Sequence, residues 1–429
     1  METTMSDNRP LASSPFSRRL FLGGAAAASA AALGACGSNH GSGSSQGAGG
    51  KTAIQQWYHQ YGESGTQQAA KRYAAEYKDA AVTVQWIPGD YDTKLTSGLA
   101  GSSGPDAFEY HLSRALVTSN EVVELTDLIA DVKDDYSDAD LGSCTVDGKI
   151  YAIPMIDDPQ LIFYKKSLLE AKGISSIETL DDLVSAAKEL TTKDVKGLFS
   201  GNTANNDGGA LVGPVIYSTG GRYLTQDMKI GFDTGLVADA LLKLRQLGTD
   251  KSLLLGAPTD WTDPGSIQNG LCAMQWIGMW AVPTMSKAIE DLGVMPFPKA
   301  APNGQPSVAS GGWSAMVSAK SKHIDEAKAF TKWLWVDNTK DQEDWSLSYG
   351  FHIPPRKSLA AKATKLQSGV AATCVQLNAD HGVQNDPNWT PAMGTALTDA
   401  VTRIVGKGAD PEKELAAAVK KINTELQKF

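Results

Sequence analysis

Apolar positions along this chain first alternate with polar ones and then recur at helical spacing, from about residue 53 onward. The pattern predicts a strand over Ala53 to Tyr58, a helix over Gly65 to Tyr77 and a second strand over Val82 to Trp86. Short strands and helices continue to alternate after this β-α-β start. We therefore expect open α/β sheets rather than an all-helical or an all-β architecture.

Several predicted helices begin with capping residues. Thr179 to Asp182 form a capping box ahead of an apolar stripe, and Asp410-Pro411 precedes an amphipathic stretch near the C-terminus. Ile324 to Leu334 also repeats apolar residues at helical spacing. Because such stripes usually pack inward, we assign them to the hydrophobic core rather than to a cofactor site.

The first 36 residues combine a pair of arginines, a soft apolar run and one cysteine. Arg18 and Arg19 precede an Ala- and Gly-rich run from Leu20 to Ala35, which is shorter than the roughly 20 strongly apolar residues of a membrane-spanning helix. Ser-Arg-Arg-x-Phe-Leu resembles the twin-arginine export signal, and Leu-Gly-Ala-Cys resembles the lipoprotein box, whose cysteine is lipidated. We expect residues 1–35 to be a signal peptide that is removed, and Cys36 to carry the lipid.

Residues 36–50 are then the lipidated cysteine and a flexible linker, because this stretch is almost wholly Gly, Ser, Ala, Asn and Gln. The chain beyond it is long enough for two domains. Its acidity, with a formal net charge of −9 for the whole chain, argues against binding to nucleic acid or to an anionic membrane surface. Membrane attachment is therefore expected through the lipid alone.

Three cysteines remain besides Cys36, namely Cys144, Cys272 and Cys374. An odd number allows at most one disulfide, and a bridge between Cys272 and Cys374 stays open. The spacing contains no Cys-x-x-Cys pair, so we expect no zinc site.

A series of short motifs follows in order from residue 51 to the C-terminus. The central one is Asp147-Gly-Lys-Ile-Tyr-Ala-Ile-Pro154, followed by Leu161-Ile-Phe-Tyr-Lys165 and Leu168-Leu-Glu-Ala-Lys-Gly173. The supporting motifs are Gly104-Pro-Asp106, Gly270-Leu-Cys-Ala-Met274, Gly278-Met-Trp280, Met295-Pro-Phe-Pro298, Gly311-Gly312, Lys328 to Trp333 and Gly350 to Ser358. Together they resemble the family 1 extracellular solute-binding proteins, the binding components of ABC importers, many of which are specific for sugars.

The resemblance implies an α/β fold of the two-lobed, periplasmic-binding-protein-like type II class, with a ligand cleft between lobes joined by crossing strands. We expect residues 51–158 and 296–336 to form lobe 1, and residues 159–295 and 337–429 to form lobe 2. The crossings are expected near Asp158, Pro296 and Val336. Stretches rich in Pro and Gly around the first two favour this placement.

A sugar site needs planar side chains for the C–H faces and carboxylates, amides or guanidinium groups for the hydroxyl edges. The aromatic candidates follow predicted strands or glycines, where open α/β sheets place ligands: Trp57, Trp276, Trp280 and Trp313. The polar candidates are Glu63, Asp106, Tyr110, Arg114, Asp158 and Arg356. For each Trp the alternative is core packing, and for Glu63 and Asp106 it is helix capping. For Arg114 the alternative is pairing with a neighbouring acid, and for Asp158 it is a solvated carboxylate. For Arg356 the resemblance implies a role in the fold as the alternative.

The predicted function is non-covalent capture of a sugar, a mono- or oligosaccharide, and its delivery to an ABC permease by a monomer held on the outer face of the bacterial cytoplasmic membrane. We expect no catalytic residue, no metal and no cofactor. A glycerol phosphodiester or a polyamine remains an alternative solute. A lipid-anchored glycan-degrading enzyme is an alternative of another class, although the one Gly-x-Ser-x-Gly match, at residues 43–47, lies in the flexible linker, and neither a His-Glu-x-x-His nor a P-loop motif occurs.

Overall fold

The computed structural model describes residues 50–201 and 211–429. The expected signal peptide with Arg18 and Arg19, the cysteine Cys36 and the linker up to residue 49 lie outside the described residues.

A five-stranded sheet, called here the first sheet, has the strand order β2-β1-β3-β12-β6. Its strands are β1 (Ala53–His59), β2 (Ala81–Ile87), β3 (Ala107–Tyr110), β6 (Ile153–Pro154) and β12 (Ser314–Val317). The first three run parallel, and β12 is antiparallel to both β3 and β6. The helix and strands predicted over residues 53–86 are confirmed as β1, α1 (Thr66–Glu76) and β2.

A six-stranded sheet, the second sheet, has the order β13-β11-β7-β9-β8, with β10 also paired to β7. Its strands are β7 (Asp158–Lys165), β8 (Lys196–Phe199), β9 (Cys272–Gly278), β10 (Leu292–Met295), β11 (Val308–Gly311) and β13 (Gly382–Val383). β7 and β9 are buried along most of their length, as expected for central strands.

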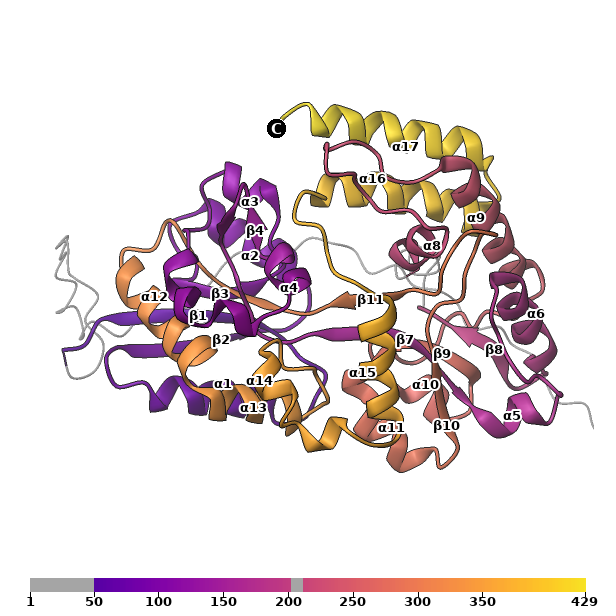
Figure 1. Cartoon of the computed structure of the whole chain (residues 1–429), viewed down its shortest axis with the longest axis horizontal. Coiled ribbons are helices and arrows are strands. Elements are labelled where there is room, and N and C mark those ends of the chain that lie inside the picture. The colour runs from indigo at the N-terminus through magenta and orange to yellow at the C-terminus, as the bar shows by residue number, and fades with distance from the viewer. Residues whose placement is uncertain (1–49, 202–210) are drawn as a thin grey trace, which may run out of the picture. The chain divides into compact units, whose positions relative to one another are not determined.

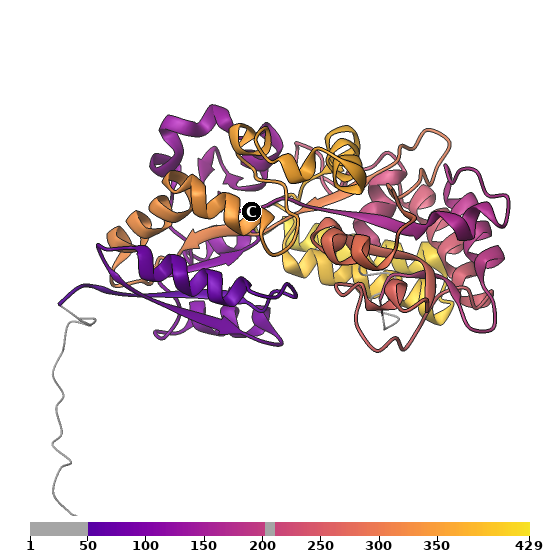
Figure 2. The ribbon, with the colours of Figure 1, turned by 90° about the horizontal axis from the view of Figure 1, so that it is seen from below.

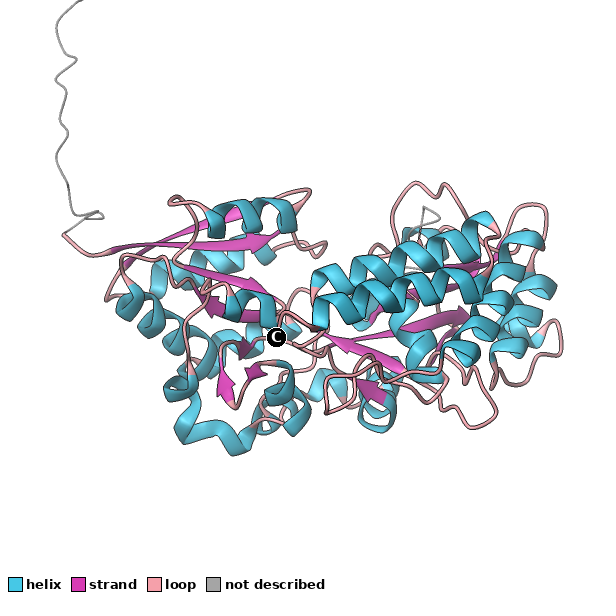
Figure 3. Ribbon diagram, turned by 90° about the horizontal axis from the view of Figure 1, so that it is seen from above, coloured by secondary structure: helices cyan, strands magenta, loops and turns pink. Residues whose placement is uncertain are grey.

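Helices cover both sheets (Figure 3). On the first sheet, α1, α12 (Ile324–Lys332), η3 (Trp333–Asp337) and α13 (Thr339–Leu347) contribute to one core, while α2 (Tyr91–Ala100) and α3 (Arg114–Thr118) contribute to another. The remaining elements before β6 are η1 (Thr126–Asp135), α4 (Asp138–Ser143) and the hairpin of β4 (Thr145–Val146) and β5 (Lys149–Ile150).

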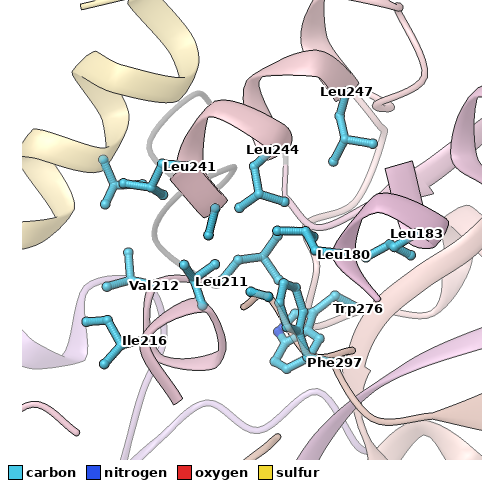
Figure 4. Close-up of a cluster of buried hydrophobic side chains, with 14 of the residues drawn as sticks. Leu180, Leu183, Leu211, Val212, Ile216, Leu241, Leu244, Leu247, Trp276 and Phe297 are labelled. Carbon is cyan, nitrogen blue, oxygen red and sulfur yellow. The ribbon is translucent and has the colours of Figure 1, made fainter. Parts of the chain in front are cut away.

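The second sheet also lies between two cores. One contains side chains of α6 (Leu180–Leu190), α8 (Val212–Ser218), α9 (Thr234–Thr249), α16 (Pro391–Val401) and α17 (Pro411–Leu426), part of which Figure 4 shows. The other contains side chains of α10 (Gly265–Gln268), η2 (Met279–Ala281), α11 (Val282–Ala288), η4 (Thr364–Leu366) and α15 (Gly369–His381). The shorter elements are α5 (Lys166–Glu170), α14 (Lys357–Ala360) and η5 (Thr402–Gly406).

The predicted helix caps are present. Thr179 and Asp182 form a reciprocal capping box at the start of α6. At the start of α17, the carboxylate of Asp410 accepts a hydrogen bond from the amide of Lys413, and Pro411 occupies the first turn. These caps satisfy amide groups that have no partner inside the helix.

Two antiparallel chain segments connect the sheets, as the courses of β7 and β11 show in Figures 1 and 2. One leads from β6 to β7, and the other leads from β11 to β12 through Gly312 and Trp313. The amide of Met155 donates to the carbonyl of Trp313 at 3.0 Å, and Gly311 pairs with Asp158. The ladder of hydrogen bonds therefore continues from one sheet to the other.

A third segment is joined to this crossing. Ile353 exchanges backbone hydrogen bonds of 2.9 and 3.0 Å with Asp157, and the side-chain amide of Gln384 donates to Asp157 at 3.0 Å and to Asp140 at 2.9 Å. Burial raises the pKa of Asp157, and the charge of Asp140 raises it further. A shared proton thus replaces repulsion between two buried carboxylates.

The chain changes sheet for the second time at Gly312-Trp313, and not near Pro296. Residues up to Gly311 still belong to the second sheet, because β11 pairs with β7. Residues after Val336 likewise stay with the first sheet for another helix, since Trp345 of α13 is buried against Tyr58, with ring centroids 5.7 Å apart. Proline and glycine mark irregular backbone, but only strand pairing shows which sheet a segment joins.

The three cysteines of the described chain are buried and free. The bridge between Cys272 and Cys374, left open above, is therefore not formed; both thiols pack among apolar side chains of one core. Neither a helix long and apolar enough to cross a membrane nor a cluster of His, Cys, Asp and Glu suited to a metal ion occurs among residues 50–201 and 211–429.

Gly312 lies in the segment from β11 to β12, where its backbone packs closely against the segment from β6 to β7. It has a φ of 153°, and a Cβ atom there would stand 1.8 Å from the carbonyl oxygen of Ile156. We expect Gly312→Ala to lower the free energy of unfolding by about 2 kcal/mol or more, because backbone must move. Urea denaturation measures the change. Gly62→Ala, at a position with no atom within 4 Å of the added Cβ, is the control and should be nearly neutral.

Candidate functional site

A cavity of about 830 Å³ is lined by residues of both sheets. From the first sheet come the segments that follow the carboxyl ends of the parallel strands: His59 to Glu63 after β1, Gly89 to Asp92 after β2, and His111 after β3. The second sheet contributes the start of β7, the end of β11 and residues of α8. Such a position, beyond strand ends and between sheets, is typical of ligand sites in α/β proteins.

Aromatic rings gather on the first-sheet side of this cavity. The imidazoles of His59 and His111 both stack on the indole of Trp313, with centroid distances of 3.9 and 4.7 Å and interplanar angles of 19° and 29°. Tyr61 lies 3.9 Å from His59, centroid to centroid. The four rings form an aromatic cluster on this wall, and the ring surface that stacking leaves uncovered can contact an apolar ligand face.

Glu109 holds two of these rings in place. It is 1% exposed, and its Oε1 accepts hydrogen bonds from the backbone amide and from Nδ1 of His59, at 2.9 and 2.6 Å. Its Oε2 accepts the hydroxyl of Tyr61 at 2.6 Å. Sequence reasoning missed this residue; the available signal was an acid inside the apolar strand Ala-Phe-Glu-Tyr.

Trp280 forms the aromatic wall on the second-sheet side. Its Nε1 donates to the carbonyl of Thr262 at 3.1 Å, and Trp261 meets it edge to face at 6.0 Å. Gly278 permits this arrangement, because a Cβ there would stand 1.7 Å from the Trp280 ring. The glycine of the Gly-x-Trp motif is thus required for the Trp280 indole to occupy this position.

Two tyrosines form a further aromatic group that the sequence did not indicate. Tyr217 and Tyr223 both line the cavity and meet at 5.4 Å, and Trp389 stacks behind Tyr223 at 4.4 Å and 11°. Burial raises the pKa of Tyr223 to about 12, so its hydroxyl stays neutral and can donate. The only sequence signal was the Gly220-Gly221 turn before Tyr223.

An ion triad occupies the cavity wall where the three connecting segments meet. Nδ1 of His352 lies 2.5 Å from Oδ1 of Asp158, and Nε2 lies 3.3 Å from Oε1 of Glu63. Burial lowers the pKa of His352, but the charge of Asp158 and hydrogen bonds to both acids outweigh it, so the pKa rises to about 10. Burial raises the pKa of Glu63, yet the hydrogen bond and charge of His352 leave it below its usual value. His352 is therefore an imidazolium between two carboxylates at neutral pH.

Neutral polar groups line the part of the cavity beside β11. Ser310 is 3% exposed, and its hydroxyl has no hydrogen-bond partner among the described residues. Gln160 and Asn385 flank Gly311, with their amide nitrogens 3.8 and 3.9 Å from where a Cβ would stand. A buried hydroxyl without a partner is costly, so a ligand or water that bonded it would be stabilised.

Of the ten ligand residues expected from sequence, the structure brings four together in the cavity: Glu63, Asp158, Trp280 and Trp313. Tyr110 lies just outside, with its ring 6.4 Å from Trp313 and its hydroxyl bonded to Asp92. The other five do not line the cavity.

Trp276 and Trp57 are core residues. Trp276 is fully buried in β9 and packs edge-on against Phe297 at 6.3 Å, as Figure 4 shows. Trp57 is 4% exposed and packs over Gly98 of α2. Side chains alternate along a strand, so these two indoles face the helices that cover each sheet.

Asp106, Arg114 and Arg356 hold structure together elsewhere. Asp106 precedes β3, at the opposite end of the strand from the cavity, and accepts hydrogen bonds from the amide of Gln55 and the hydroxyl of Ser321. The guanidinium of Arg114 pairs with both carboxylate oxygens of Asp147, and that of Arg356 donates to Asp135 and to the carbonyl of Val336. All three residues therefore serve the fold, although Asp106 does so by bonding Gln55 of β1 and Ser321 and not by capping a helix.

We expect His352→Gln to lower the free energy of unfolding by about 3 kcal/mol at neutral pH, because it leaves two buried carboxylates without their cation. The pKa of His352 is raised from 6.5 to about 10, so its contribution is fully present below pH 6.5 and is lost as the pH rises through about 10. Urea denaturation across this range should show the difference between wild type and variant shrinking with rising pH. A difference that does not change with pH would contradict the assignment, and His381→Gln should show no such trend.

Solved structures share this fold. A solute-binding protein from Thermotoga lettingae bound with α-D-tagatose superposes with a TM-score of 0.74 at 19% identity, covering 87% of this chain and 99% of that one. Maltose-bound MalE3 of T. maritima gives a TM-score of 0.72 at 22% identity, with 87% and 99% covered. The expected two-lobed α/β fold of type II is confirmed.

Sequence relatives and a family profile agree with the fold. The diacetylchitobiose binding protein DasA of Streptomyces coelicolor is 25% identical over 364 residues, which cover 78% of this chain and 79% of that protein. The arabinooligosaccharide-binding protein of Bacillus subtilis is 22% identical over 294 residues, covering 65% and 67%. The profile of the bacterial extracellular solute-binding proteins matches residues 57–335. The chain therefore belongs to the bacterial extracellular solute-binding proteins, and it is a binding protein of the cell exterior rather than an enzyme.

Proposed function

We propose that this chain captures a sugar in the cavity between its two sheets and presents it to the membrane permease of an ABC importer. The proposal rests on one observation: a single cavity is lined both by aromatic rings and by hydroxyl, amide and carboxylate groups. Sugar rings need such a pairing of apolar faces with hydrogen-bonding edges. The relatives described above are a diacetylchitobiose binding protein and an arabinooligosaccharide-binding protein, and their names support the same class of solute.

The site would contact the solute from both sides. Trp313 and His59 would cover one face from the first sheet, while Trp280 and Tyr223 would approach from the second. Ser310, Gln160 and Asn385 would bond hydroxyl groups. The volume of about 830 Å³ admits a monosaccharide or a short oligosaccharide.

Delivery would follow from closure of two lobes on the solute. Strand pairing and core contacts favour a first lobe of residues 51–157 and 313–350, and a second lobe of residues 158–201, 211–311 and about 357–429. A solute that bonds both lobes favours the closed form by its differential affinity, and the permease would recognise that form. No cofactor takes part in this cycle.

The alternative solutes fit less well. A glycerol phosphodiester calls for guanidinium or ammonium groups, and neither Lys nor Arg occurs among the described residues that line the cavity. A polyamine would use the carboxylates and the ring faces, but it has no hydroxyl groups for Ser310, Gln160 and Asn385 beside β11.

The protein would act as a lipid-anchored monomer on the outer face of the cytoplasmic membrane. In this proposal residues 1–35 are a twin-arginine signal peptide, Cys36 carries the lipid, and the linker up to residue 50 lets the lobes reach the permease. Tethering would raise the effective concentration of the protein near its partner.

Sugar binding is tested by thermal shift and calorimetry on the mature chain, using mono- and oligosaccharides beside a glycerol phosphodiester and spermidine. A sugar at 100 times its dissociation constant should stabilise the fold by about 2.7 kcal/mol.

Trp280→Ala should weaken the binding of that sugar about tenfold or more. Gly311→Leu should abolish binding, because its side chain would enter the cavity between Gln160 and Asn385. Saturable binding of a non-sugar solute alone, or turnover of the sugar, would refute the proposal.

Anchoring and export are tested in cells by fractionation. We expect Cys36→Ala to move the protein from the membrane to the medium or the soluble exported fraction, since one lipidation site carries the attachment. Replacing Arg18 and Arg19 by Lys should retain the precursor inside the cell. An unchanged membrane fraction for Cys36→Ala would exclude the anchor.

A further inference from the structure

The cavity carries an unbalanced charge. Its lining includes the carboxylates of Glu63, Asp90, Asp92 and Asp158, but neither Lys nor Arg among the described residues. His352 offsets one of these charges, and it is engaged by Asp158 and Glu63 together. A negative excess thus remains on the first-sheet side of the site.

Among these four carboxylates, Asp92 has the fewest hydrogen-bond and ion-pair partners in the described chain. Asp90 caps α2, accepting hydrogen bonds from the amide and the hydroxyl of Thr93 at 3.0 and 2.7 Å. Asp92, in contrast, is exposed in the first turn of α2, and its described partner is the neutral hydroxyl of Tyr110. No ion pair joins it to a cation in the described chain.

The groups around Asp92 do not neutralise it. Burial raises the pKa of Asp92 and outweighs the lowering effect of His59, and Nδ1 of His59 is already bonded to Glu109 at 2.6 Å. Tyr110 lies 6.4 Å from Trp313, and Tyr91 lies 6.0 Å from it, centroid to centroid. Asp92 therefore stands beside the rings that would hold a sugar, and electron-rich ring faces also attract cations.

A separate observation points to a ligand here. The hydroxyl of Ser310 is buried in the cavity lining and has no partner in the described structure, while Gln160 and Asn385 beside it are neutral. The cavity thus combines neutral groups suited to hydroxyls with an acidic part suited to a positive charge.

We infer that the site prefers a sugar that carries a protonated amine, with the ring against Trp313 and the ammonium group at Asp92. This inference rests on the proposed sugar-binding function. Anionic sugars, such as uronic acids and sugar phosphates, are repelled by the same carboxylates. Neutral sugars bind through the aromatic and amide contacts alone.

The test compares sugars that differ only in the amine. Calorimetry on the wild-type mature chain, in slightly acidic buffer of low salt, uses glucosamine against glucose and the glucosamine disaccharide chitobiose against cellobiose and N-acetylated chitobiose. The amine-bearing member of each set should bind about fivefold to tenfold more tightly. High salt should reduce the advantage, since an exposed charge pair is screened.

Asp92→Asn removes the charge and keeps a group that can bond Tyr110. The preference for the amine should fall to about twofold or less in this variant. Asp131→Asn, which removes an exposed carboxylate far from the cavity lining, is the matched control and should keep the preference.

The outcomes separate the two proposals. Equal or tighter binding of neutral or N-acetylated sugars by the wild type overturns the amine preference and leaves sugar binding intact. An amine preference that Asp92→Asn retains removes Asp92 from the assignment and overturns the inference as stated. Spermidine binding as tight as the amino sugars overturns the preference for an amino sugar, and no binding by any sugar overturns both proposals.

Discussion

The structure depends on the antiparallel crossing of two chain segments between its sheets. The carbonyl of Trp313 accepts a hydrogen bond from the amide of Met155. Gly312 packs against the carbonyl of Ile156, and Gly311 pairs with Asp158. Because this ladder is continuous, it fixes where the carboxyl ends of β1, β2 and β3 face the second sheet. The cavity is the space between these strand ends and the second sheet.

The same crossing supplies the electrostatics of the site. Asp157 points to the buried pair with Asp140 and Gln384, while the next residue, Asp158, pairs with His352 in the cavity wall. Neighbouring residues of an extended segment point to opposite sides, so one step along the chain separates a structural carboxyl group from one at the site. Both groups avoid an isolated buried charge, the first by sharing a proton and the second by pairing with an imidazolium.

Carbohydrate sites often place aromatic rings on rigid supports, and here the supports are visible. Glu109 orients His59 and Tyr61, Thr262 and Gly278 fix Trp280, and Trp389 backs Tyr223. Rings held in this way lose little conformational freedom when a solute arrives, which favours binding. In the proposed site, the carboxylate of Asp92 adds selectivity for the charge of the solute to the contacts made by the aromatic rings.

Local patterns in the sequence determined much of the architecture: the β-α-β start, the capping box of α6, the Asp410 cap of α17, the family motifs, and the glycine-flanked segments that contain Trp280 and Trp313. Periodicity and capping depend on near neighbours, so a single sequence reveals them. Only the tertiary structure decided that Trp276 faces the core while Trp280 faces the cavity, that Arg114 and Arg356 pair with acids far along the chain, and that His352, Tyr217 and Tyr223 join the site. Those outcomes depend on contacts between segments separated by 33 residues for Arg114 and by 221 for Arg356, and no local pattern specifies which distant side chains will meet.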